Sequence, residues 1–156
     1  GLRVMATTIA SGTLTVKLTE AVSLNGSDYS ATNTVTVASI NEITQRIVTI
    51  PPQELIILYE FGTVVGPGKV VYATAKYFRT TNKDSANPIN LNLRTASTNQ
   101  WVATTPGQTF MCSMGGSDGV ASGTVVGPSL ADITTITAYN PHASASVDIE
   151  TYVAST

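Results

Sequence analysis

The residue types that most often carry catalysis or bind metal ions are scarce in this chain. His142 is the only histidine and Cys112 the only cysteine. A zinc site needs several His or Cys ligands close together, so neither residue predicts one. His142 follows Pro141 in an expected loop, which favours a solvated side chain over a catalytic base. Cys112 lies in an expected strand and is interpreted as a small buried hydrophobic residue, with no second cysteine for an intrachain disulfide.

Paired carboxylates, which carry glycoside hydrolysis, offer one candidate pair. Asp148 and Glu150 alternate with the apolar Val147, Ile149 and Val153, so the two acids share one face of an expected strand. An acidic face opposite an apolar one is typical of a solvated strand surface rather than of a catalytic pair. No Gly-x-Ser-x-Gly elbow marks a nucleophilic serine. We therefore expect no enzymatic activity and no catalytic residue.

Two polar segments could in principle bind an ion. The Gly-rich run Gly115–Gly119 lacks the Lys-Ser/Thr of a P-loop and the acidic ladder of an EF-hand, which favours a flexible loop. Asn82, Asp84 and Asn87 carry oxygens of the kind that Ca²⁺ prefers, but a hydrogen-bonded turn accounts for the same residues. No metal and no cofactor is predicted.

Aromatic residues are the remaining candidates for binding. Tyr72, Phe78 and Trp101 could stack on a sugar ring if they lay on an exposed sheet face, although core packing or a protein interface is favoured. Lys76 falls on the same face of an expected strand as Tyr72 and Phe78. These four residues, Tyr72, Lys76, Phe78 and Trp101, are the predicted contacts with a partner.

Composition narrows the class of protein further. Charged residues make up 12% of the 156 residues, about half the usual share, and the formal net charge is −2. The missing charge is replaced by 25 threonines and 14 serines. Eight Lys and Arg residues form no basic stripe, which argues against nucleic-acid binding, and no apolar run reaches the roughly 18 residues of a membrane span. The length favours one domain over residues 1–156, with residues 1–12 as a candidate N-terminal arm.

The elements that must position these residues show a period of two. Leu14, Val16 and Leu18 alternate with polar residues, and Asn25-Gly26 then provides a turn. A long strand over Lys69–Thr80 has apolar residues on both faces, which predicts a core on one side and a partner on the other. Eight to ten short antiparallel strands with little or no helix predict an all-β sandwich or barrel.

A stretch in the second half of the chain resembles a known family. The strand Tyr77–Asn82 is followed by an Asn/Asp turn, the alternating strand Ile89–Leu93 and the turn Thr105–Phe110. Together with the closing strands, this pattern over residues 70–153 is similar to virion proteins of tailed phages. The resemblance implies a jelly-roll-like β-sandwich in a capsid or tail component, and it carries over no functional residue.

Three functions remain open at this point. The first is a capsid decoration (cement) protein, a homo-oligomer (a trimer is the guess) that binds the major capsid protein on the virion surface. The second is a tail, baseplate or fibre subunit, and the third is a carbohydrate-binding module that uses Trp101. The start of the chain shows no secretory signal, which favours synthesis in the host cytoplasm.

Overall fold

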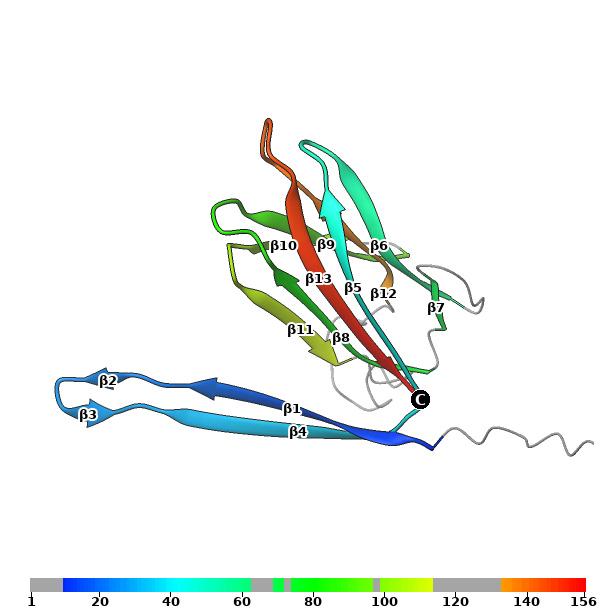
Figure 1. Ribbon diagram of the computed structural model, residues 1–156. Coiled ribbons are helices and arrows are strands. Elements are labelled where there is room, and N and C mark those ends of the chain that lie inside the picture. The colour runs from blue at the N-terminus through cyan, green and yellow to red at the C-terminus, as the bar shows by residue number, and fades with distance from the viewer. Residues whose placement is uncertain (1–9, 63–68, 72–73, 97–98, 114–132) are drawn as a thin grey trace, which may run out of the picture. The chain divides into compact units, whose positions relative to one another are not determined.

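The computed structural model describes residues 10–62, 69–71, 74–96, 99–113 and 133–156, and in these residues every regular element is a β-strand (Figure 1). The described residues include no helix that is long and apolar enough to cross a membrane. The chain divides into two compact units, Ile43–Ser155 and the residues up to Glu42 together with Thr156. The predicted arm, residues 1–12, lies almost wholly outside the described residues.

The larger unit is a sandwich of two sheets. One sheet has the strand order β10-β9-β12-β6-β7 and the other β11-β8-β13-β5. The five-stranded sheet contains β6 (Leu55–Gly62), β7 (Lys69–Val71), β9 (Ile89–Thr95), β10 (Asn99–Thr104) and β12 (Ile133–Tyr139). The four-stranded sheet contains β5 (Glu42–Ile50), β8 (Ala75–Asn82), β11 (Thr109–Ser113) and β13 (Val147–Ser155).

The strand order of the sandwich is that of a jelly roll. Setting aside the short parallel edge strand β7, eight strands remain in chain order. The first, eighth, third and sixth of them lie side by side in one sheet, and the second, seventh, fourth and fifth in the other. Two interleaved Greek keys give this order. The predicted all-β sandwich is confirmed, but the described residues of the chain form thirteen strands, more than the expected eight to ten.

Alternation explains which side chains fill the core. Ile89 and Leu91 of β9 and Ile136 and Ala138 of β12 are fully buried, while the residues between them face outward. Three aromatic rings complete the centre: Phe78 makes edge contacts with Tyr59 at 5.5 Å and with Phe61 at 6.5 Å between ring centroids. Aromatic pairs at such distances add to the free energy of burial.

The predicted single strand over Lys69–Thr80 is wrong. Lys69–Val71 forms β7 in one sheet, whereas Ala75–Asn82 forms β8 in the other. The chain turns between them, and the backbone N–H of Thr74 donates to the carbonyl of Val71 at 3.2 Å. The sequence between Val71 and Thr74 contains neither Gly nor Pro, the residues that usually mark a turn. The alternating pattern therefore continues across the position at which the chain passes from one sheet to the other.

The smaller unit is a two-stranded ribbon. Its strands β1 (Gly12–Glu20) and β4 (Ala31–Ile40) are antiparallel, and β2 (Ser23–Leu24) and β3 (Ser27–Asp28) continue them toward the turn (Figure 1). Asn25 and Gly26 have φ values of 51° and 80°, as a two-residue hairpin turn of type I′ requires. The predicted turn is confirmed.

Candidate functional site: two outward-facing surfaces

One face of the ribbon is predominantly apolar. The register is continuous from Leu14↔Val37 through Glu20↔Ala31 to Leu24↔Ser27, because the N–H of Tyr29 also bonds to the carbonyl of Val22 at 2.8 Å. Residues two apart on a strand share a face. We call this face the ribbon's apolar face, and its large apolar members are Leu14, Val16, Leu18, Val22, Leu24, Tyr29, Val35 and Val37.

The opposite face of the ribbon is polar. Thr15 faces Thr36, Lys17 faces Thr34 and Thr19 faces Thr32 across the ladder. The hydroxyls of Thr19 and Thr32 lie 3.4 Å apart. The ribbon is therefore amphipathic. Strand pairs at the surface of a larger structure have the same division into one apolar and one polar face.

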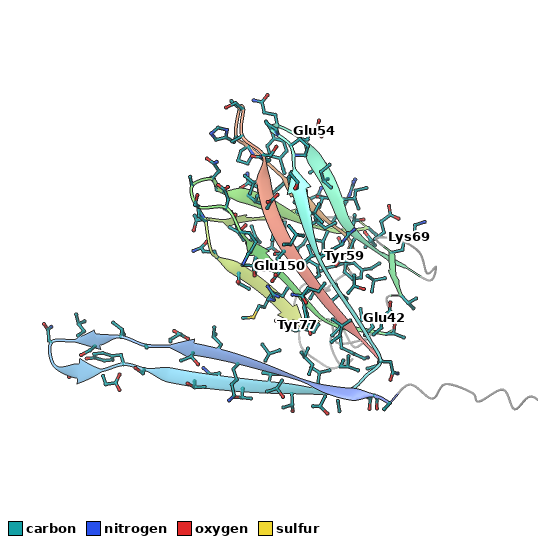
Figure 2. All side chains as sticks on the ribbon, in the orientation of Figure 1. Glu42, Glu54, Tyr59, Lys69, Tyr77 and Glu150 are labelled. Carbon is teal, nitrogen blue, oxygen red and sulfur yellow. The ribbon has the colours of Figure 1, made fainter. Side chains whose placement is uncertain are left out.

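Five of the eight large side chains on the ribbon's apolar face are exposed, whereas Leu14, Val16 and Val37 are half-buried. Val35 is 62% exposed, Tyr29 61% and Leu24 58%, and side chains project from both faces of the ribbon (Figure 2). A two-stranded hairpin without a packed face is at best marginally stable in water. The sequence thus specifies a ribbon that needs a second surface to cover it.

A second surface lies on the outer face of the five-stranded sheet. The register places Ile57, Thr137, Asn92 and Trp101 in one row across β6, β12, β9 and β10. The next row contains Leu55, Tyr139, Asn90 and Ala103. Leu55, Ile57 and Trp101 are each a little over half exposed.

Asn92 is the unusual member of this surface. Its side chain is on the outer face but only 9% exposed, and its Oδ1 has no hydrogen-bond partner in the described structure. Trp101 lies directly opposite Asn92 on β10. The exposed indole offers a flat surface on which a ring compound could stack, whereas the Asn92 Oδ1 is shielded and reaches a ligand only if a neighbouring side chain moves.

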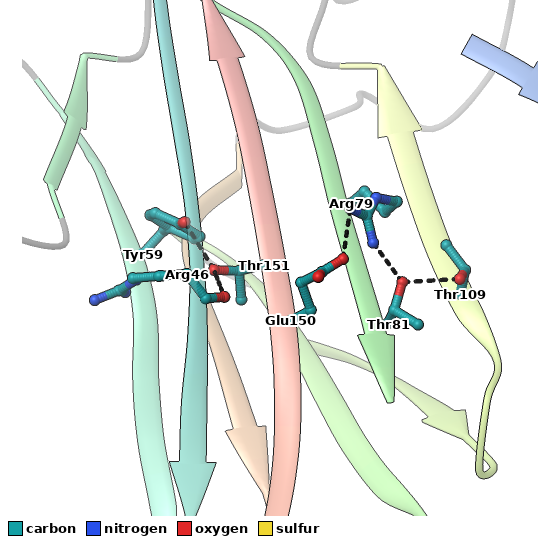
Figure 3. Close-up of polar contacts among 7 residues, drawn as sticks. All are labelled: Arg46, Tyr59, Arg79, Thr81, Thr109, Glu150 and Thr151. Atoms are coloured by element: carbon teal, nitrogen blue, oxygen red, sulfur yellow. Dashed lines mark hydrogen bonds and ion pairs between the residues drawn. The ribbon is translucent and has the colours of Figure 1, made fainter. Parts of the chain in front are cut away.

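The outer face of the four-stranded sheet is polar and well paired (Figure 3). Arg79 forms an ion pair with Glu150 at 2.7 Å and donates to the Thr81 hydroxyl at 2.6 Å. Its guanidinium also lies 5.3 Å from the centre of the Tyr152 ring. The hydrogen bond from Arg79 lowers the pKa of Glu150 below its usual value. Asp148 accepts a hydrogen bond from Thr49 at 2.6 Å, so the two acids act in surface pairs.

A further polar set ties the edge strand β5 to the core (Figure 3). The hydroxyls of Tyr59 and Thr151 are 2.9 Å apart, and the Thr151 hydroxyl lies 3.4 Å from the carbonyl oxygen of Arg46. The Arg46 guanidinium donates to the carbonyl of Leu58 and lies 4.9 Å from the centre of the Tyr59 ring. These bonds link β5 of one sheet to β6 of the other and to β13 beside it.

The polar loop residues are explained by turns. Asn82 accepts from the N–H of Asp84 and donates to the carbonyls of Asn87 and Thr104. Asp84 Oδ2 accepts from the N–H groups of Ala86 and Asn87, and these bonds lower its pKa. The interpretation of Asn82, Asp84 and Asn87 as a hydrogen-bonded turn is confirmed.

His142 also takes part in a turn. Its Nδ1 accepts hydrogen bonds from the N–H groups of Ser144 and Ala145, at 3.1 and 2.8 Å. The fully buried Asn140 beside it donates to the carbonyls of Ile50 and Ala145. The described residues contain no group of three His, Cys, Asp or Glu side chains that could hold a metal ion.

The four predicted partner contacts do not gather at one place. Phe78 is fully buried in the core, which removes it from the candidate contacts, because its side chain packs inward from β8. Lys76 is half-buried on β8, and Trp101 is exposed on β10 in the other sheet. Tyr72 and the Gly115–Gly119 loop lie outside the described residues.

Comparisons with known proteins identify no family for this chain. No family model and no curated protein matches this chain. Among solved structures, a chain from Bacillus endospore appendages, described as a novel family of disulfide-linked pili, matches with a TM-score of 0.39 and 12% identity. The match covers 73% of this chain and 88% of that one. This likeness is too distant to carry an inference about function.

Proposed function

We propose that this protein is a non-enzymatic structural subunit of a virion, and specifically a capsid decoration protein that binds the major capsid lattice. The observation that carries the proposal is the largely exposed apolar face of the ribbon, which suits a chain that functions within an assembly. Interface cores are depleted in Lys, Glu and Asp, and this chain has few of them. Burying surface shared with capsid subunits would raise the free energy needed to separate them.

Two further points support the virion rather than another assembly. The jelly roll is an architecture of many viral capsid proteins, which is an analogy at the level of the fold. The pattern of strands and turns over residues 70–153 is similar to tailed-phage virion proteins. Both points concern the sandwich, whereas the ribbon supplies the surface for assembly.

The decisive experiment is to locate and count the chain in purified particles. Quantitative mass spectrometry is expected to find hundreds of copies per particle, as a decorated lattice requires. A handful of copies would instead identify a tail, baseplate or fibre subunit. Absence from particles after removal of host proteins would overturn the virion role.

Carbohydrate binding is a second candidate, favoured by the geometry around Trp101. The half-exposed indole and the shielded amide of Asn92 lie opposite each other on the outer face of the five-stranded sheet. Jelly rolls also occur among lectins.

Fluorescence gives a direct test of this second candidate, because Trp101 is the only tryptophan. A sugar that stacks on Trp101 is expected to change its emission, and Asn92→Ala is expected to weaken that change. Ile57→Ala, at the other end of the same row, is the matched control. No change across a panel of glycans would exclude this candidate.

A further inference from the structure

The ribbon's apolar face is larger than its two longest strands suggest. Because β2 and β3 keep the register of β1 and β4, the face runs from Leu14 to Leu24 on one strand and from Ser27 to Val37 on the other. The ten steps from Leu14 to Leu24, at about 3.4 Å each, make it roughly 34 Å long. It carries one charged side chain, Glu20, and strand edges on both sides let that carboxylate reach water.

The area of this face falls at the low end of the range for specific protein interfaces. Two such faces packed together would remove on the order of 1,000 Å² from water, against about 1,200 Å² for the smallest standard interfaces. A surface that matched only part of the ribbon would leave aliphatic side chains exposed. A second ribbon has the same length and width, so it covers the whole face.

Chemistry also favours an identical partner. Branched aliphatic residues dominate the face, and the cross-strand pairs Leu14↔Val37 and Val16↔Val35 are wholly aliphatic. Two faces of this kind can interdigitate as the inner faces of a sandwich do. Of its twelve positions only Glu20, Ser27 and Asn33 are polar, so the face offers few groups by which a different protein would be selected.

We propose that the ribbon's apolar face packs against the same face of a second copy of this chain. The two ribbons then form a small four-stranded sandwich with the threonine-rich faces outward. This inference deepens the proposed structural role by naming one partner, and it rests on that role only for its biological setting.

The test compares two double variants of the full chain in analytical ultracentrifugation. Val16→Lys with Val35→Lys places two lysines on a cross-strand pair of the apolar face. Thr15→Lys with Thr36→Lys places two lysines on the neighbouring pair of the polar face, which controls for charge and for repulsion within the ribbon. The apolar-face variant is expected to raise the dimer Kd at least about 100-fold, since two lysines would be buried without partners. The polar-face variant is expected to change the Kd less than about 3-fold.

Two outcomes would overturn the proposal. One is a wild-type chain that stays monomeric at 100 micromolar, which would mean that another surface covers the ribbon. The other is a dimer that both variants leave intact. Thermal unfolding of the sandwich checks that each variant is folded. Particle copy number is measured separately, so loss of the virion role and loss of the dimer remain distinguishable.

Discussion

The sandwich and the ribbon use the same sequence pattern with opposite results. Ile89 and Leu91 alternate with asparagines and are fully buried, because a second sheet packs against them. Val16 and Leu18 alternate with threonine and lysine in the same way, yet Leu18 is 45% exposed. Alternation therefore predicts which side of a strand will be covered, but it does not predict whether the cover lies in the same chain.

The largest expected difference in unfolding free energy is between removing an aromatic ring from the sandwich and removing one from the ribbon. Phe78→Ala removes a fully buried ring that contacts Tyr59 and Phe61, and is expected to cost about 3–5 kcal/mol of sandwich stability. Tyr29→Ala on the ribbon is expected to change the same transition by less than about 0.5 kcal/mol. Chemical denaturation followed by far-UV circular dichroism measures both. An unchanged midpoint for Phe78→Ala would contradict the described core.

A smaller loss is expected from the buried amide of the sandwich. Asn140→Ala leaves the carbonyls of Ile50 and Ala145 and the N–H of His142 without their partner, at a cost of about 2–3 kcal/mol. Asn99→Ala, on the exposed start of β10, is the control and should be nearly neutral. Equal losses in the two variants, measured by thermal unfolding, would show that the Asn140 bonds contribute no stability.

A substitution in the ribbon turn is expected to destabilise the ribbon and to leave the stability of the sandwich unchanged. Gly26→Ala forces a side chain into positive φ and is expected to cost about 1 kcal/mol in the ribbon. Gly12→Ala is the matched control, since Gly12 has open space around it and no positive φ. Hydrogen exchange is expected to speed up at the amides of β1–β4 only in Gly26→Ala. Faster exchange in β9 or β12 as well would show that the two units unfold together.

The smallest effect concerns pH. The Arg79 hydrogen bond lowers the pKa of Glu150, so this pair stabilises the fold above the usual glutamate pKa of 4.5, and its contribution is lost as pH falls through the lowered value. Glu150→Gln should therefore be less stable than wild type by about 0.5 kcal/mol at pH 7, with the difference shrinking below pH 4.5. Glu54→Gln, which changes an exposed acid, is the control. A difference that is constant with pH would assign the loss to packing.

Much of the fold follows from local sequence. The alternation of Ile89–Leu93 and the Asn25-Gly26 turn each predict the observed element, because strand faces and type I′ turns depend on a few neighbouring residues. The change of sheet between Val71 and Thr74 could not be predicted in this way, since it depends on which distant strands β7 and β8 join. Phe78 was predicted as a partner contact for the same reason, since the direction of its side chain depends on which sheet β8 joins.

The candidate surfaces were predicted only in part. Trp101 could be named from its residue type, whereas Asn92 becomes notable only once β9 and β10 are in register. The ribbon's apolar face was missed, although a signal was present. Even positions from Leu14 to Leu24 and odd positions from Tyr29 to Val37 are mostly apolar, and the parity changes at the Asn25-Gly26 turn.

The two-residue turn of the ribbon also sets an order in time. A hairpin closed by such a turn forms in about 1–10 microseconds, while a sandwich of strands distant in the chain takes milliseconds to seconds. In the jelly roll, β5 must wait for β13, the last strand, before its edge is paired. During that interval the ribbon forms and reopens repeatedly, because a hairpin whose apolar face is not covered is only marginally stable in water. The threonine-rich face carries few apolar side chains, so hydrophobic contact with other nascent strands is confined to one face of the ribbon.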